Sequence, residues 1–436
     1  MPRVAVLGAG ASGLKAAFDL SRGGADVVVF EAEERTGGRV RTVEVAGEAV
    51  DFGAESFEAG VASKWIEEFT ELLILPPDIE WISPYAKVRE AAWWWPDGAL
   101  VRTHSDQIAG TPAALRVEET FERNIEAGLD VAVATGVDLG DLAARYAYAV
   151  SGSGAFSEAI EPSFYSAQDR ARNTSPGDDA RPFVDGEPYG VGRLFGLYAD
   201  CLASQPRVEI RVASRVDEIT PQLDRGWTLR VDDDRDSFDA LIVTASVDVI
   251  TRPDFPLPRS IGQQVRAAFA GIELGAYTKL ALHWPSATTA LGKEAMLGFY
   301  VGQAGLPAWQ VSKLRDSEVV LLALAGSRAR DLDEPRTTQQ AIDVVRAITG
   351  VDTRPTRAVI SRWNSSPSFR GAYSYTKVGA GPARPGLQSS LLDLYAPVGL
   401  HFAGEAFSVP LYGSLEATWT TGADAAARCL RVLGLE

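Results

Sequence analysis

Glycines near the start of the chain have the spacing of a turn that binds the diphosphate of a nucleotide cofactor: Gly8, Gly10 and Gly13. They separate an apolar run at 4–7, which predicts a strand, from an amphipathic segment at 11–22, which predicts a helix. The first helical residues, Ala11 and Ser12, would place backbone N–H groups beside the anion. A strand-to-helix turn without a ligand is the alternative for this motif taken alone.

A carboxylate stands where a dinucleotide site places one. Residues 27–30 are apolar and predict a second parallel strand, which ends at Glu31, 18 positions after Gly13, and is followed by Ala32. A carboxylate there accepts hydrogen bonds from both ribose hydroxyls and repels a 2′-phosphate. The first part of the chain therefore predicts a βαβ unit that binds FAD or NAD rather than NADP.

Charge and composition exclude several classes of function. The chain has 42 Lys and Arg residues against 58 Asp and Glu residues, and this net charge of −16 repels nucleic acids and anionic membranes. Its apolar runs are too short to span a bilayer. Two cysteines and three histidines, far apart in the sequence, form no metal motif. Because the N-terminus also lacks a secretory pattern, a reduced, cytoplasmic protein is expected.

A second glycine pair and an arginine follow the ribose carboxylate: Gly37, Gly38 and Arg39. Here the sequence resembles the flavin-containing amine oxidase superfamily, which includes monoamine and polyamine oxidases and protoporphyrinogen oxidases. The resemblance implies that these three residues embrace the diphosphate and ribityl part of FAD. It also implies that the backbone of Val216 holds the adenine.

A motif near the C-terminus is similar to the second flavin motif of that superfamily. It consists of Gly404-Glu405 after a short apolar run, and then of Ser414-Leu415 at the start of a long helical segment. The resemblance implies that this helix N-terminus faces the pyrimidine end of the flavin ring, where its dipole stabilises negative charge on the reduced ring.

One lysine is singled out by its position in an alternating segment. Lys279 lies in 276–284, where Thr278, Leu280 and Leu282 share the opposite, largely apolar face. A solvated lysine at a sheet edge is the alternative. By resemblance to polyamine oxidases, Lys279 holds a water against flavin N5, and such a water could relay the proton left by the two-electron step.

Aromatic residues of the segment 363–375 resemble those beside the flavin ring. Tyr373 matches one wall of the aromatic cage that holds the amine, and Trp363 matches an aromatic near the ring. Ala372 stands where monoamine oxidases carry the cysteine that links FAD, so non-covalent FAD is expected. Ser414 stands in place of the second cage tyrosine. The candidates to replace that wall are Phe407, Tyr412 and the tryptophans Trp93, Trp94 and Trp95, for which a core strand is the alternative.

A fourth segment bears on the charge of the substrate. By resemblance to polyamine oxidases, Gly53 and Ala54 lie under the flavin and Glu58 faces the substrate tunnel, where its carboxylate would attract an ammonium group. A solvated loop carboxylate is the alternative for Glu58. Glu55 stands where amino-acid oxidases of the superfamily usually carry an arginine for the substrate carboxylate, which counts against an amino-acid substrate.

Other segments must supply the elements that position these residues. Residues 42–52 predict a hairpin, 276–284 a strand, 339–348 a helix, 399–403 a strand and 414–433 a long helix. The segments expected to return to the sheet of the first domain are 208–216, 227–231 and 238–245.

The whole pattern predicts an α/β fold with two interleaved domains. The expected ranges of the Rossmann-like FAD-binding domain, a βαβ dinucleotide fold, are 1–60, 195–250 and 385–436. The expected ranges of the substrate-binding domain, a mixed sheet with helices, are 61–194 and 251–384.

The function that these motifs imply is oxidation of a primary or secondary amine by FAD. A hydride would pass from the amine carbon to flavin N5, giving an imine, and O2 would then be reduced to H2O2. Lys279, Tyr373 and Glu58 are the candidate catalytic residues. Three alternatives stay open: dehydrogenation of a large substrate as in protoporphyrinogen oxidases, oxidation of an L-amino acid, and a flavin-binding protein that is not an oxidase.

Overall fold

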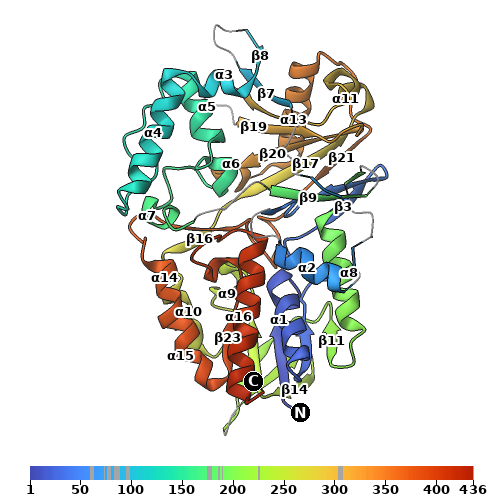
Figure 1. The fold of residues 1–436 in the computed structure, drawn as a ribbon, viewed down its shortest axis with the longest axis vertical. Helices are drawn as coiled ribbons and strands as arrows, with labels where there is room; N and C mark the ends of the chain where they lie inside the picture. The colour runs from blue at the N-terminus through green and yellow to red at the C-terminus, as the bar shows by residue number, and fades with distance from the viewer. Residues whose placement is uncertain are drawn as a thin grey trace.

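A five-stranded parallel sheet carries the N-terminal strand of the chain and forms the lower half of the molecule in Figure 1. The computed structural model describes residues 1–58, 63–72, 74–75, 80–82, 89–94, 99–173, 179–184, 187–188, 190–223, 226–302, 308–330 and 332–435. In sheet order the strands are β11 (Val208–Arg211), β2 (Asp26–Phe30), β1 (Arg3–Leu7), β15 (Ala240–Val243) and β23 (Leu400–Phe402). The predicted βαβ unit is therefore confirmed.

Both faces of this sheet are covered, which explains why its three central strands, β2, β1 and β15, are largely apolar. Val4 and Val6 of β1 point into one core, and Ala5 and Leu7 point into another. The first core lies under α1 (Ala11–Arg22), α8 (Val191–Ala203) and α16 (Leu415–Leu433). The second core lies under α9 (Val247–Ile250), α10 (Arg259–Ala268) and α14 (Ala383–Leu387).

The expectation for the middle strands is wrong in part. Segments 208–211 and 240–243 do join the parallel sheet, but 227–231 does not. A separate antiparallel sheet is formed by β12 (Glu218–Pro221), β13 (Trp227–Val231) and β14 (Asp234–Phe238). The alternation of Trp227 and Leu229 toward the core predicts a strand but not its partner, and a tight turn at 232–233 lets β13 pair with its neighbour in sequence.

A seven-stranded sheet forms the upper half of the molecule (Figure 1). Its order is β21 (Arg357–Ile360), β17 (Tyr277–His283), β20 (Val319–Ala325), β19 (Ala308–Lys313), β18 (Met296–Val301), β7 (Arg89–Trp94) and β8 (Val101–Thr103). Because β17 pairs with strands on both sides, Lys279 is not at a sheet edge. The predicted alternation holds: Leu280 and Leu282 join one core, whereas Ala281 joins the core on the opposite face.

Short helices cover one side of the upper sheet, at the upper left of Figure 1. They are α3 (Ser105–Ala109), α4 (Pro112–Glu126), α5 (Leu142–Val150), α6 (Ala155–Glu158) and α7 (Ala167–Arg170). Thr111, Asp141 and Ser166 cap the N-termini of α4, α5 and α7 by accepting from backbone N–H groups. On the other side lie α11 (Pro285–Leu291), α12 (Ser327–Arg330) and α13 (Glu334–Thr349).

The remaining elements include the predicted hairpin, formed by β3 (Thr42–Val45) and β4 (Glu48–Asp51). The helix expected near 339–348 begins earlier, at Glu334, because Asp333 caps it. The other elements are β5 (Phe57–Glu58), α2 (Ser63–Glu71), β6 (Glu80–Ile82), β9 (Asp179–Val184), β10 (Glu187–Pro188), β16 (Ile272–Leu274), β22 (Ser374–Thr376), a π-helix (Gln388–Leu392), α15 (Asp393–Tyr395), and 3₁₀ turns at Ala396–Val398 and Glu405–Phe407.

The proposed division into domains stays a prediction, and packing across the proposed boundary at residue 60 is close. Trp65 of α2 contacts Phe195 of α8, with ring centroids 4.9 Å apart. Across the described residues, none of the helices combines the length and apolar character that crossing a membrane requires.

Candidate functional site

A cavity of about 1080 Å³ brings most of the predicted site residues together. The predicted residues that line it are Gly8, Gly10, Ala11, Ser12, Glu31, Ala32, Gly37, Gly38, Arg39, Gly53, Ala54, Glu55, Val216, Lys279, Trp363, Tyr373, Gly404, Glu405, Ser414 and Leu415. Gly13 lies behind the lining. The backbone of Glu58 is in β5, where it pairs with Asp179, but its side chain lies outside the described part of the chain.

The glycine-rich turn is held by contacts that admit no side chain. A Cβ on Gly13 would lie 1.9 Å from the carbonyl oxygen of Gly8, which has a φ of +102°. Gly13 therefore lets α1 approach β1 closely, as a dinucleotide turn requires. The second glycine pair approaches this turn, since a Cβ on Gly38 would lie 3.1 Å from the Cα of Gly10. The N-terminus of α1 thus faces the cavity, next to the glycines of the turn and of the second glycine pair, which carry no side chains.

Glu31 is buried at the end of β2 and is oriented by the backbone. Its Oε2 accepts from the N–H of Ala9 at 2.8 Å, and its Oε1 accepts from the N–H of Glu33 at 2.9 Å. Burial raises the pKa of the Glu31 carboxyl, and these two backbone hydrogen bonds oppose that shift. Each oxygen keeps a lone pair toward the cavity, so the carboxylate is suited to accept from ribose hydroxyls.

The C-terminal motif meets the second glycine pair through an ion pair. Nη1 of Arg39 lies 3.1 Å from Oε1 of Glu405, which is buried. Nη1 also donates to the carbonyl oxygen of Ala372. Ser414 caps α16 by accepting from the N–H of Ala417 at 3.1 Å. The N-terminus of α16, like that of α1, therefore opens onto the cavity and presents a partial positive charge to it.

Lys279 is buried and each of its three protons has an acceptor. Nζ donates to the carbonyl oxygens of Asp51 at 3.1 Å and Gly53 at 3.0 Å, and it lies 2.9 Å from Oε2 of Glu55. The ammonium thereby ties β17 to the segment that follows β4. The sequence-based expectation assigned Lys279 a water and gave Glu55 no role beside it. The structure places Lys279 and Glu55 together at the cavity wall.

The aromatic wall is present in part. The hydroxyl of Tyr373 donates to the carbonyl oxygen of Ser157 at 2.8 Å, and the indole of Trp363 donates to that of Phe52 at 2.9 Å. Of the candidates for the second wall, Tyr412 lines the cavity, although the guanidinium of Arg384 covers one face of its ring at 3.8 Å.

The other candidates for that wall do not line the cavity where they are described. Phe407 is buried in the lower core, stacked on Phe402 with centroids 6.0 Å apart. Trp93 is buried in the core of the upper sheet. The side chain of Trp94 and the whole of Trp95 lie outside the described residues. The core interpretation of the run is therefore confirmed for Trp93.

Sequence reasoning missed the wall formed by the short helices. Its members include Tyr146 of α5, Phe156 and Glu158 of α6, Arg170 of α7, and Phe299 of β18. Glu158 is buried and its Oε1 lies 3.0 Å from Nε of Arg170, while burial raises the pKa of Glu158. No motif marks these residues, because they come from separate short elements. Only a carboxylate in the apolar stretch 154–160 offered a weak signal.

The residues present fit FAD held without a covalent bond. Two helix N-termini, a bare glycine turn and a backbone-oriented carboxylate suit the diphosphate and ribose of a dinucleotide. Neither cysteine of the chain, Cys201 or Cys429, lines the cavity, and Ala372 does. When bound, FAD would be held by residues from the turn, the second glycine pair and the C-terminal motif.

Comparisons with known proteins agree with this geometry. The chain is 26% identical to polyamine oxidase 4 of Oryza sativa subsp. japonica, over 98% of this chain and 88% of the relative. Cyclohexylamine oxidase from Brevibacterium oxydans has a similar structure, with a TM-score of 0.76, 20% identity and 99% of each chain covered. Putrescine oxidase bound to putrescine gives a TM-score of 0.70, 20% identity and 98% coverage of each chain.

The family described as flavin containing amine oxidoreductase matches residues 11–430, which is nearly the whole chain. The match includes the second glycine pair, the strand of Lys279, the aromatic wall and the C-terminal motif. This chain therefore belongs to the flavin-containing amine oxidoreductase family and is an FAD-dependent enzyme.

Proposed function

We propose that this enzyme oxidises a primary or secondary amine to an imine. The observation that carries the proposal is the single cavity shared by the dinucleotide turn, the Lys279–Glu55 pair and Tyr373. A cofactor that binds along the turn and the C-terminal motif would have its reactive end among these side chains. The relatives and structural neighbours with whole-chain matches, named for polyamines, putrescine and cyclohexylamine, support an amine as the substrate.

The side chains would orient the substrate and exclude water from it. FAD supplies the two-electron acceptor when it is bound. Tyr373 presents a ring that attracts partial positive charge and aligns the carbon beside the nitrogen. Phe156, Tyr146 and Phe299 form an apolar wall that excludes bulk water. A neutral nitrogen is needed when the hydride leaves, so the ammonium must first lose a proton.

We assign the handling of that proton to the polar end of the cavity. Lys279 is fully engaged by its acceptors, so a water at this wall would donate to the carboxylate of Glu55, which lies 2.9 Å from Nζ of Lys279. Glu58 stays a candidate for attracting the ammonium. The net charge of −16 also favours approach of a cationic amine. We propose O2 as the acceptor of the electrons, with H2O2 as product, and a cytoplasmic location.

Anaerobic reduction of the bound flavin by substrates tests the proposal. The purified holoprotein is titrated with putrescine, a longer polyamine, cyclohexylamine, an L-amino acid and a porphyrinogen, and the visible absorbance of the flavin is followed. We expect an amine to bleach the flavin, and air to restore it with formation of H2O2. The matched controls are alcohols with the same carbon skeletons, butanediol and cyclohexanol, which have no nitrogen to deprotonate.

The compound that bleaches the flavin distinguishes amine oxidation from the alternative functions. Bleaching by the porphyrinogen alone would assign the enzyme to dehydrogenation of a large substrate. Bleaching by the amino acid alone would assign it to the L-amino-acid oxidases. That result would contradict the expectation drawn from Glu55, which stands where those enzymes usually carry an arginine. A flavin that no compound reduces would contradict the oxidase proposal altogether.

A further inference from the structure

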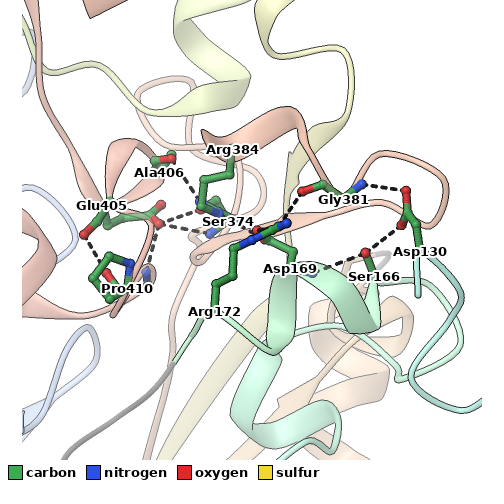
Figure 2. Close-up of polar contacts among 12 residues, drawn as sticks. Asp130, Ser166, Asp169, Arg172, Ser374, Gly381, Arg384, Glu405, Ala406 and Pro410 are labelled. Carbon is green, nitrogen blue, oxygen red and sulfur yellow. Dashed lines mark hydrogen bonds and ion pairs between the residues drawn. The ribbon is translucent and has the colours of Figure 1, made fainter. Parts of the chain in front are cut away.

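A fully buried arginine, Arg384, bonds on one side to Asp169 and on the other to Ser374 and Ala406 (Figure 2). Arg384 belongs to α14, and its side chain has no exposed surface. Its Nε lies 3.0 Å from Oδ2 of Asp169 in α7, which is equally buried. Replacing a buried pair by apolar residues often costs nothing, whereas leaving one partner alone is costly. The pair therefore calls for an explanation beyond stability of the fold.

Two other contacts of Arg384 fall on one segment, 405–414, which connects the two parts of the C-terminal flavin motif. Its Nη1 donates to the carbonyl oxygen of Ala406 at 2.9 Å. Its guanidinium stacks on the ring of Tyr412, 3.8 Å from the centroid. Two points of the segment are thus held directly by one rigid, planar group.

A third contact reaches Glu405 through a serine. Nη1 of Arg384 donates to Oγ of Ser374 at 2.9 Å, and Oγ donates in turn to Oε2 of Glu405 at 2.7 Å. A hydroxyl has a single proton. Because Oγ accepts from Arg384, its proton is free to be donated to Glu405. Ser374 directly follows Tyr373, so the same link fixes the aromatic wall against the segment.

Glu405 also contacts other residues that line the cavity, Gly413 and Arg39. Its Oε2 also accepts from the N–H of Gly413 at 3.1 Å, and its Oε1 pairs with Arg39. An unbroken series of hydrogen bonds therefore runs from Asp169 through Arg384, Ser374 and Glu405 to Arg39. It joins α7, which carries Asp169, to the arginine that follows the second glycine pair.

We propose that Arg384 is a positioning residue for the cofactor, which sets the affinity for FAD by fixing Glu405 and the segment 405–414. It acts through Ser374 and Glu405 and does not itself line the cavity. A merely structural arginine would change the stability of the fold and leave FAD binding as it is. The inference goes beyond the proposed amine oxidation and does not depend on which substrate is oxidised.

The test uses two serines in matched surroundings, both drawn in Figure 2. Ser374 and Ser166 are each fully buried, and each donates to a carboxylate oxygen at 2.7 Å. Ser374 joins Arg384 to Glu405, whereas Ser166 caps α7 and donates to Asp130. Ser374→Ala and Ser166→Ala thus each remove a hydrogen bond from a serine to a carboxylate, but only the first breaks the side-chain series from Arg384 to Glu405.

The dissociation constant of FAD is measured by equilibrium dialysis of each holoprotein, alongside thermal unfolding. We expect both variants to unfold at lower temperature. Ser374→Ala should weaken FAD binding about tenfold, the loss of one hydrogen bond to a charged group. Ser166→Ala should change it by about twofold or less, since it loses a bond to the backbone N–H of Asp169 but leaves the carboxylate of Asp169 on Arg384. The visible spectrum of bound flavin should shift in Ser374→Ala alone.

Unchanged FAD affinity in Ser374→Ala would overturn the proposal, and so would an equal loss in both serine variants. Arg384→Lys provides a second measurement, since a lysine has one nitrogen and cannot bond both to Asp169, which Nε reaches, and to Ser374 and Ala406, which Nη1 reaches. We expect it to weaken FAD binding by at least the factor seen in Ser374→Ala. An Arg384→Lys protein that folds and holds FAD as tightly as the parent would also overturn the proposal.

Discussion

A buried ammonium is stable only where acceptors surround it, and two lysines of the upper sheet show two ways of meeting this requirement. Lys313 of β19 donates to the carbonyl oxygens of Lys293 and Leu314, and burial lowers its pKa. Lys279 of β17 donates to two carbonyl oxygens and also pairs with Glu55. Only Lys279 lines the cavity. We propose that the carboxylate partner at this place gives Lys279 a role in chemistry as well as in packing.

The two lysines give a matched pair of substitutions. Lys279→Met should slow reduction or reoxidation of the flavin about a hundredfold while FAD stays bound, because the charge that orients Glu55 is removed. Lys313→Met should leave both rates unchanged and lower only the stability. Stopped-flow absorbance of the two holoproteins, with the amine found in the titration, measures these rates. Equal rates in the two variants would remove Lys279 from the mechanism.

The N-termini of α1 and α16 both face the cavity, and the two helices pack closely against each other. In α16, a Cβ on Gly422 would lie 2.6 Å from the carbonyl oxygen of Ser12 in α1. Gly422 therefore allows the two helices whose N-termini face the cavity to pack backbone against backbone. By contrast, at Gly196 in the middle of α8 no atom of the described residues outside its own helix backbone lies within 4 Å of the Cβ position. Both glycines lie within helices, but Gly422 is closely packed and Gly196 has open space around its Cβ position.

Alanine at these two positions should therefore change the stability in opposite directions. Gly422→Ala should destabilise the protein by about 1–3 kcal/mol, because the clash exceeds the gain in helix propensity, and should loosen FAD at the shifted turn. Gly196→Ala should be neutral or stabilising by up to ~1 kcal/mol, since propensity acts alone there. Urea unfolding of both variants gives the free energies. A stabilised Gly422→Ala would show that α1 and α16 separate at little cost.

At the scale of the whole molecule, the parts of the site that could be predicted are those whose signal is local in the sequence. The turn around Gly10, with Glu31 at the end of the next strand, is written within a single βαβ unit. Arg384 was missed because its partner Asp169 lies 215 positions away and no motif joins them. The partner of β13 was wrong for a different reason, since alternation fixes the face of a strand but not its neighbour, and the actual partners are adjacent in sequence.

The pH dependence of the stability belongs to this scale too, because the buried group responsible is not among the residues that line the cavity. His401 of β23 is buried, and neither ring nitrogen has a hydrogen-bond partner among the described residues. Burial, with the charge of Arg428 as a smaller cause, lowers the pKa of His401 to about 4 from 6.5. The unfolded chain therefore takes up a proton below pH 6.5 that the folded chain takes up only near pH 4.

Stability from this group is fully present above pH 6.5 and falls as the pH drops toward 4, by up to about 3 kcal/mol. His401→Leu removes the titrating ring without breaking a hydrogen bond, so its stability should fall less across the same window. Urea unfolding of both proteins with excess FAD measures the difference at each pH. Dilute protein is needed because the sequence pI of about 4.8 lies in the window. Parallel curves for the two proteins would mean that His401 is protonated in the fold, and that a buried acceptor reaches it.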